Sequence, residues 1–107
     1  MATNNNEIKW SGTISALSQL DGRVYVRLAT PELAKRFMQQ AEAESFTFPD
    51  GAKPTSREPE NFMAVNPDHT IHYIGTFGRM AYSIQTATVN GQRLIRAVYA
   101  AEPEEAE

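Results

Sequence analysis

The feature that most constrains the fold is Asn90-Gly91, which separates two runs of alternating apolar and polar residues. Both residues tolerate the positive φ angles that a two-residue type I′ turn requires. The pattern predicts a hairpin, and its register follows by counting outward from the turn. The predicted cross-strand pairs are Val89–Gln92, Thr88–Arg93, Thr86–Ile95, Ile84–Ala97 and Tyr82–Tyr99.

Two further turn signals precede this hairpin. Asn66-Pro67-Asp68-His69 is typical of a type I turn, with proline at its second position, and Gly75-Thr76-Phe77-Gly78 suits a four-residue loop. Counting through both turns predicts the pairs Phe62–Tyr73, Ala64–Ile71, Tyr73–Met80 and Ile71–Tyr82. Three turns then agree on one apolar face, which indicates a four-stranded antiparallel meander.

The N-terminal half contains two alternating runs on either side of Leu20-Asp21-Gly22. They predict a β-hairpin closed by a three-residue loop with Gly22 in the left-handed region. Thr30-Pro31-Glu32 then predicts the start of a helix over about 30–45, with threonine as the N-cap and proline in the first turn. The expected fold is therefore α+β: an N-terminal β-hairpin, one α-helix, and the four-stranded antiparallel meander packed against that helix.

Composition indicates one domain over residues 7–101, between a polar N-terminus (1–6) and an acidic tail (102–107) that are both expected to be disordered. The tail holds four of the 13 acidic residues, so the other nine nearly balance the ten basic ones. Such a balance argues against strong, non-specific attraction to nucleic acid. The chain has no cysteine, no long apolar run and no signal-peptide pattern, so we expect a cytoplasmic protein without a disulfide framework.

No residue pattern predicts catalysis. His69 and His72 have no cysteine or cluster of acids to complete a metal site, and no serine lies in a nucleophile motif. We therefore expect no enzyme activity, no metal and no cofactor.

Two segments are candidates for binding a small anion such as a nucleotide. The loop containing Lys53, Thr55 and Arg57 combines two cations with a hydroxyl group, which suits a phosphate, although a solvated loop has the same composition. The second segment contributes Gly75, Phe77, Gly78 and Arg79. Its glycine spacing is that of the loop that clamps nucleotides in the KH family, where the loop joins helices rather than the strands predicted here.

Two sets of residues are candidates for an interaction surface. Leu94, Arg96 and Val98 lie on the second meander face, which is less polar than a solvated face. Either the N-terminal hairpin or another chain is expected to cover it. Arg23, Tyr25 and Arg27 share the outer face of the N-terminal hairpin. Cations around an aromatic ring suit single-stranded nucleic acid, but they also protect an exposed strand from aggregation.

Residues 46–55 (FTFPDGAKPT) and 71–78 (IHYIGTFG) resemble segments of small uncharacterised proteins of bacterial prophages and mobile elements. The resemblance implies a bacterial cytosolic setting and a role as an accessory or counter-defence factor, and it brings no functional residues with it. The leading hypothesis is a small non-catalytic binding module that acts through protein contacts, either with a partner or as a homodimer. The alternatives are a binder of a small anionic ligand and a binder of single-stranded nucleic acid.

Overall fold

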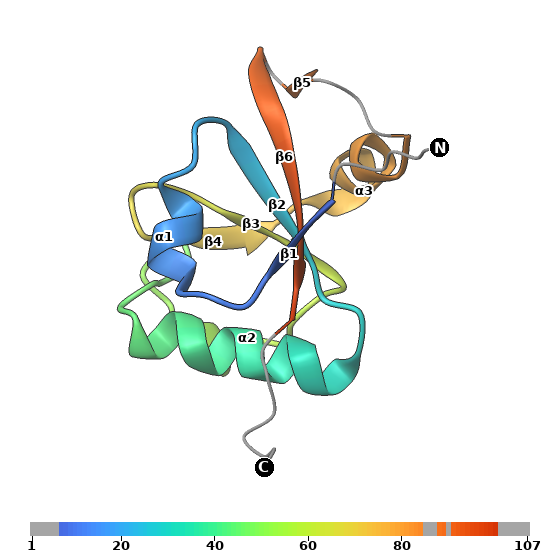
Figure 1. Ribbon diagram of the computed structural model, residues 1–107. Helices are drawn as coiled ribbons and strands as arrows, with labels where there is room; N and C mark the ends of the chain where they lie inside the picture. Colours follow the sequence, from blue (N-terminus) through green and yellow to red (C-terminus); the bar gives the residue numbers. More distant parts are fainter. Residues whose placement is uncertain (1–6, 85–87, 90, 101–107) are drawn as a thin grey trace.

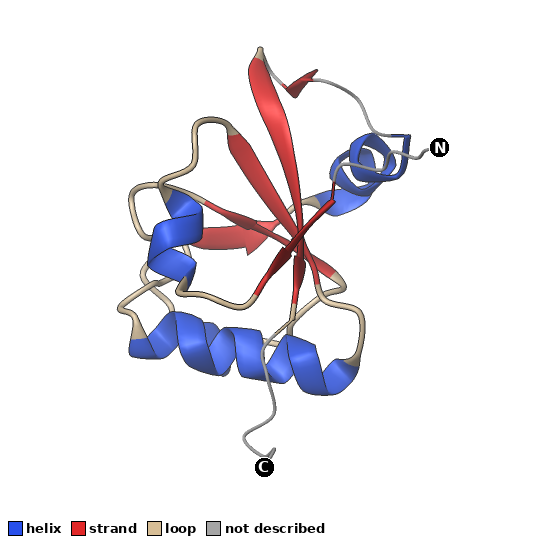
Figure 2. Cartoon of the chain, viewed as in Figure 1, coloured by secondary structure: helices blue, strands red, loops and turns tan. Residues whose placement is uncertain are grey.

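The computed structural model describes residues 7–84, 88–89 and 91–100, which form one mixed β-sheet with helices around it (Figures 1 and 2). The predicted α+β class is confirmed. The predicted disordered ends, 1–6 and 102–107, lie outside the described residues. In chain order the elements are β1 (Glu7–Trp10), α1 (Ile14–Ser18), β2 (Arg23–Arg27), α2 (Pro31–Ala43), the 3₁₀ turn η1 (Pro54–Ser56), β3 (Phe62–Val65), β4 (Ile71–Tyr73), α3 (Gly75–Ile84), β5 (Thr88–Val89) and β6 (Gln92–Tyr99).

The sheet order is β1-β6-β2-β3-β4, with β5 paired to β6. β6 runs parallel to both β1 and β2, whereas β3 and β4 are antiparallel to their neighbours. The predicted N-terminal hairpin is therefore wrong, because β6 lies between β1 and β2. Helix α1 occupies part of the predicted first strand, and its N-cap Thr13 accepts a hydrogen bond from the Ala16 N–H at 3.1 Å.

The hairpin around residues 90–91 is confirmed next to the turn, where Thr88 pairs with Arg93 and Val89 with Gln92. Gly91 has the positive φ (80°) that such a turn needs; Asn90 lies outside the described residues, as does the predicted Thr86–Ile95 pair. The pairs predicted for Met80, Tyr82 and Ile84 are wrong, because Gly75–Ile84 is helix α3. Gly75 to Gly78 form its first turn rather than a loop between strands. The predicted four-stranded antiparallel meander is therefore wrong as well.

Strands β3 and β4 form the predicted hairpin, and its turn is closed by the His69 N–H, which donates to the Asn66 carbonyl oxygen at 3.2 Å. The register differs by one residue from the prediction, since Tyr73 pairs with Met63 and Ile71 with Val65. All four residues of β3 are apolar (FMAV), so no polar side chain in the sequence shows which face is outward. The shift places Met63 and Val65, rather than Phe62 and Ala64, in the main core.

Helices α1 and α2 pack on the same sheet face and form the main core with it. The predicted start of α2 is confirmed: the Thr30 side chain accepts from the Leu33 N–H at 3.1 Å, and proline follows it. Phe37 of α2 meets Tyr99 of β6 edge-on, with ring centroids 5.4 Å apart. The core residues that are fully buried include Ile14, Leu17, Val26, Phe37, Ala41, Met63, Ile71 and Ala97.

Helix α3 lies apart from α1 and α2 and packs on the opposite sheet face (Figure 1). Tyr82 forms a second, smaller core there with Tyr25 and Ala64, flanked by partly buried Phe62 and Leu94. The face that was expected beneath an N-terminal hairpin or another chain is thus covered in part by α3. No described helix is long and apolar enough to cross a membrane.

Candidate functional site

Helix α3 exposes large apolar side chains on the side turned away from the sheet. Phe77, Met80 and Ile84 are 85%, 53% and 68% exposed, and their spacing of three and four residues places them along one side of a helix. We call these three residues the α3 ridge. Monomeric proteins seldom expose several large apolar side chains together unless they serve as a contact surface.

The ridge is not what anchors α3. Tyr82 holds the helix on the sheet: its ring lies 4.9 Å from the Phe62 ring, and its hydroxyl donates to the Ala97 carbonyl oxygen at 3.2 Å. Burial, followed by contact with Glu7, raises the pKa of Tyr82 far above its usual value. Gly78 permits close packing, because a Cβ at this position would lie 2.6 Å from Cβ of Ile74. The buried side of α3 therefore stabilises the helix while the ridge stays exposed.

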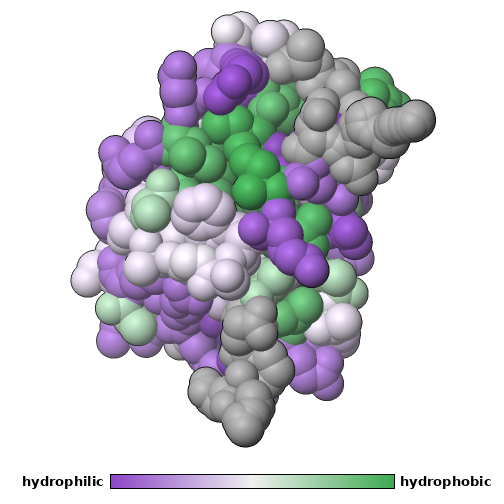
Figure 3. Space-filling model, viewed as in Figure 1, coloured by the Kyte–Doolittle hydropathy of each residue, from purple (hydrophilic) through white to green (hydrophobic). Residues whose placement is uncertain are grey.

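The helix that carries the ridge has little charge. Arg79 is the one charged residue on α3, and its Nη1 lies 3.5 Å from Oε1 of Glu60. Ile8 on β1 is a fourth exposed large apolar residue, at 40%. Figure 3 also shows hydrophobic surface over the upper parts of β2 and β6, bordered by hydrophilic residues.

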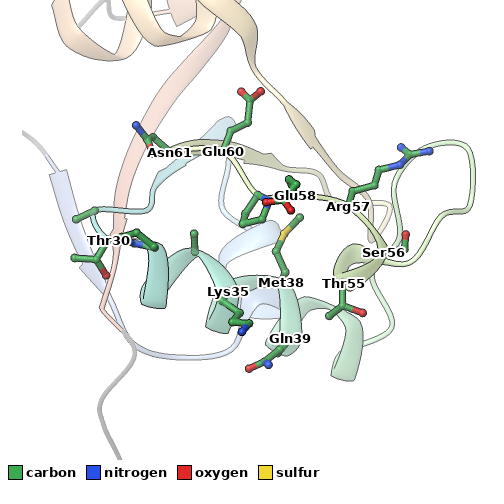
Figure 4. Close-up of a pocket in the computed structure, with 14 residues that line it drawn as sticks. Thr30, Lys35, Met38, Gln39, Thr55, Ser56, Arg57, Glu58, Glu60 and Asn61 are labelled. Carbon is green, nitrogen blue, oxygen red and sulfur yellow. The ribbon is translucent and has the colours of Figure 1, made fainter.

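A separate pocket of about 640 Å³ opens between α2 and residues 55–61 (Figure 4). Its volume lies within the range of small-molecule sites. Met38 points from α2 toward the centre, and buried Ala34 lies beside it on the same helix. The lining residues are Ala29, Thr30, Pro31, Ala34, Lys35, Met38, Gln39, Thr55, Ser56, Arg57, Glu58, Pro59, Glu60 and Asn61.

Two of the charged side chains that line the pocket are already paired. Arg57 donates to Asp50 at 2.6 Å and stacks over the Phe48 ring at 4.7 Å, so its side chain points away from the pocket centre in Figure 4. The hydrogen bond from Arg57 is the main cause that lowers the pKa of Asp50. Glu60 is paired with Arg79. Among the described residues, Lys35 on the helix and Glu58 on the loop have no ion-pair partner within 4.0 Å.

The hydroxyl groups of the loop also have partners. The Thr55 hydroxyl donates to Oε1 of Glu42 at 2.6 Å, which is the largest cause that lowers the pKa of Glu42. The Ser56 hydroxyl donates to the Lys53 carbonyl oxygen at 2.6 Å. Since each hydroxyl has one proton, these two groups can offer only their lone pairs to a ligand.

The structure separates the residues proposed for an anion site. Thr55 and Arg57 line the pocket, whereas exposed Lys53 precedes η1 and does not line it. Gly75, Phe77, Gly78 and Arg79 belong to α3, and Arg79 approaches the pocket only through its ion pair with Glu60. The two arginines of the proposed site are thus both engaged by carboxylates.

The six residues proposed for an interaction surface meet on one sheet face, because Arg23 pairs with Leu94, Tyr25 with Arg96 and Arg27 with Val98 in the parallel β2–β6 register. Tyr25 and Arg96 are buried, and Tyr82 of α3 lies 5.7 Å from the Arg96 guanidinium. Arg27 contacts Glu7 at 3.3 Å. The buried Nε of Arg23 has no hydrogen-bond partner within the described part of the chain. Of the six, Tyr25, Leu94 and Arg96 therefore pack against Tyr82 of α3.

A serine–histidine contact escaped the sequence-based prediction, because its members come from α1 and from the β3–β4 turn. Ser15 Oγ lies 3.3 Å from Nε2 of His69. However, Glu44 accepts hydrogen bonds from the backbone N–H groups of Ile14 (3.0 Å) and Ser15 (2.7 Å). Those donors are therefore not available to stabilise an oxyanion. The described residues contain no cluster of three His, Cys, Asp or Glu side chains that could hold a metal ion.

Searches of protein-family models, of curated proteins and of solved structures found no match to this chain.

Proposed function

We propose that this chain is a small, non-catalytic binding module that acts through protein–protein contacts, with the α3 ridge as its contact surface. The observation that carries the proposal is the exposure of Phe77, Met80 and Ile84 on one side of a helix that is anchored by its other side. The cysteine-free sequence fits a cytoplasmic module. The resemblance to mobile-element proteins suggests an accessory or counter-defence role.

The size of the ridge favours a groove on a different protein over a second copy of this chain. The three side chains expose about 400 Å² of mostly apolar area, whereas a stable interface buries about 800 Å² on each partner. Two ridges packed against each other would fall short of that area. A groove that encloses the ridge and both flanks of α3 buries more, and anchors spaced i, i+3 and i+7 are the usual contacts of a helix in a groove.

The charges on α3 indicate the rim of that groove. The helix has no acidic residue, and its one cation is Arg79. Arg93 lies in the adjoining hairpin. An apolar groove with an acidic rim would complement this surface, and Arg79 could exchange Glu60 for a carboxylate of the partner.

A photo-crosslinking amino acid in place of Phe77 tests the proposal, because it reports what lies against the ridge. In a bacterial lysate we expect a specific crosslinked product that excess unlabelled wild-type protein displaces and that Met80→Glu abolishes. The matched control carries the crosslinker at Ala16, which is also exposed but lies on α1. Met80→Glu should change the free energy of unfolding by no more than about 0.5 kcal/mol, because residue 80 is exposed.

Light scattering of the purified protein distinguishes the two occupants. We expect a monomer that forms no crosslink to itself. A crosslink between two copies, or a dimer that Met80→Glu dissociates, would show that the ridge binds a second copy of this chain rather than a groove on another protein. Equal crosslinking from positions 77 and 16, unaffected by Met80→Glu, would refute the ridge as a contact surface.

A further inference from the structure

The pocket between α2 and residues 55–61 is independent of the α3 ridge, and its charges point to a particular kind of ligand. Its cationic groups do not form an anion site. Arg57 is paired with Asp50, and two carboxylates, Glu58 and Glu60, also line the pocket. A phosphate would meet two carboxylates there and no unpaired arginine. The uncompensated charges are one ammonium group on the helix wall, Lys35, and one carboxylate on the loop wall, Glu58.

From this arrangement we infer that the pocket binds a small zwitterion with an apolar body, such as an apolar α-amino acid or a short peptide with free termini. The carboxylate of the ligand pairs with Lys35 and its ammonium group pairs with Glu58. Its apolar part covers Met38, whose side chain points into the pocket (Figure 4), and the neighbouring Pro59.

The hydroxyl groups strengthen the assignment of the ammonium group to the loop wall. Thr55 and Ser56 donate their protons to Glu42 and to the Lys53 carbonyl oxygen, so neither hydroxyl has a proton left to donate to an anion. The Glu58 carboxylate can likewise only accept hydrogen bonds, and an ammonium group is the ligand group that donates three. An anion would find no donor among these three side chains.

Calorimetric titration with L-leucine, N-acetyl-leucine and leucinamide tests the inference. The three probes have the same apolar body, but the second lacks the ammonium charge and the third lacks the carboxylate. We expect leucine to bind at least about tenfold more tightly than either analogue. Glycyl-leucine serves as the peptide probe, and inorganic phosphate and AMP serve as anionic probes that should not bind at the pocket.

Substitutions then assign each charge. Lys35→Gln and Glu58→Gln should each weaken leucine binding by about tenfold or more. Glu58→Gln should also remove the preference for leucine over N-acetyl-leucine, because the partner of the ammonium group is gone. Lys53→Gln is the matched control, since Lys53 is an exposed lysine near η1 that does not line the pocket; it should leave binding unchanged.

All other outcomes overturn the inference. Equal binding of the three leucine probes would leave the two charges without a role. Tighter binding of phosphate or AMP that depends on Lys35 would show an anion site instead. If neither leucine nor glycyl-leucine binds at about 10 mM, the pocket is not a site for a zwitterion. Since both substituted side chains are exposed, circular dichroism should show that the variants remain folded.

Discussion

Replacing Glu44 by glutamine tests the contact that ties α1 to the end of α2. Oε1 of Glu44 accepts from the Ser15 N–H at 2.7 Å, and Oε2 accepts from the Ile14 N–H at 3.0 Å and from the Gln40 amide at 2.7 Å. The first N–H groups of a helix have no partner within it, so this one carboxylate supplies acceptors for two of them. Glu44 lies about thirty residues away in the sequence, so its carboxylate joins two helices that are distant along the chain.

The expected cost follows from these contacts. Glutamine keeps one carbonyl oxygen, but its NH₂ group would face a backbone N–H that then has no acceptor. The remaining hydrogen bonds also lose the assistance of the negative charge. We expect Glu44→Gln to lower the free energy of unfolding by about 2 kcal/mol. For a domain of this size, such a loss lowers the melting temperature by about 10 °C.

The pH dependence distinguishes a role of the charge from a role of packing. Burial alone would raise the pKa of Glu44, but the hydrogen bonds from Gln40, Ser15 and Ile14 outweigh burial and hold the pKa below its ordinary value of 4.5. The stabilisation by the carboxylate is therefore complete above that value and is lost as pH falls through the pKa of the folded protein. The difference between wild type and Glu44→Gln should accordingly shrink as pH falls below 4.5 and through the pKa of the folded protein.

Urea denaturation followed by circular dichroism, at neutral pH and at a series of pH values below 4.5, measures both effects. Asp21→Asn is the control, because Asp21 is an exposed carboxylate in the α1–β2 connection. Equal stability of wild type and Glu44→Gln at neutral pH would refute the reasoning. A loss that is just as large at acidic pH would show that shape, rather than charge, makes the contact.

Two further predictions concern α3 and the sheet face beneath it. Gly78→Ala should destabilise the protein by about 1–2 kcal/mol, because the added Cβ would lie 2.6 Å from Cβ of Ile74. Chemical denaturation measures this loss. The control Gly12→Ala should show little change, because the atom nearest to its added Cβ is 3.6 Å away. Burial and then the nearby Arg23 lower the pKa of His72, so its stabilising effect is present above the unfolded value near 6.5 and is lost as pH falls below it. His72→Gln should therefore flatten the stability profile between about pH 5 and 7, and an unchanged slope would contradict the assignment.

Local turn and capping residues predicted the parts of the fold that depend on neighbours in sequence. Thr30 and Pro31 correctly placed the start of α2, and the hairpin at residues 90–91 was correct for the two pairs next to its turn. The sheet order was beyond such signals, because β1 and β2 both pair in parallel with β6 at the far end of the chain. Turn residues specify only strands that follow one another.

The pocket shows the same division between local and distant information. The loop composition pointed to Thr55 and Arg57, and both line the pocket. Lys35 and Met38 belong to α2 and were predicted only as parts of a helix, and nothing in the sequence placed that helix beside the loop. The ion pair that occupies Arg57 depends on Asp50, which reaches it because η1 and the preceding turn fold back on themselves.

The error at residues 75–84 bears on function. Met80, Tyr82 and Ile84 alternate with less apolar residues, so the segment was predicted as a strand with all three side chains in the core. In the helix, Tyr82 is buried and the other two are exposed. Stability alone does not explain why Phe77, Met80 and Ile84 are exposed to water, because exposed apolar side chains add nothing to the core. Contact of the α3 ridge with another molecule, as proposed above, would account for that exposure.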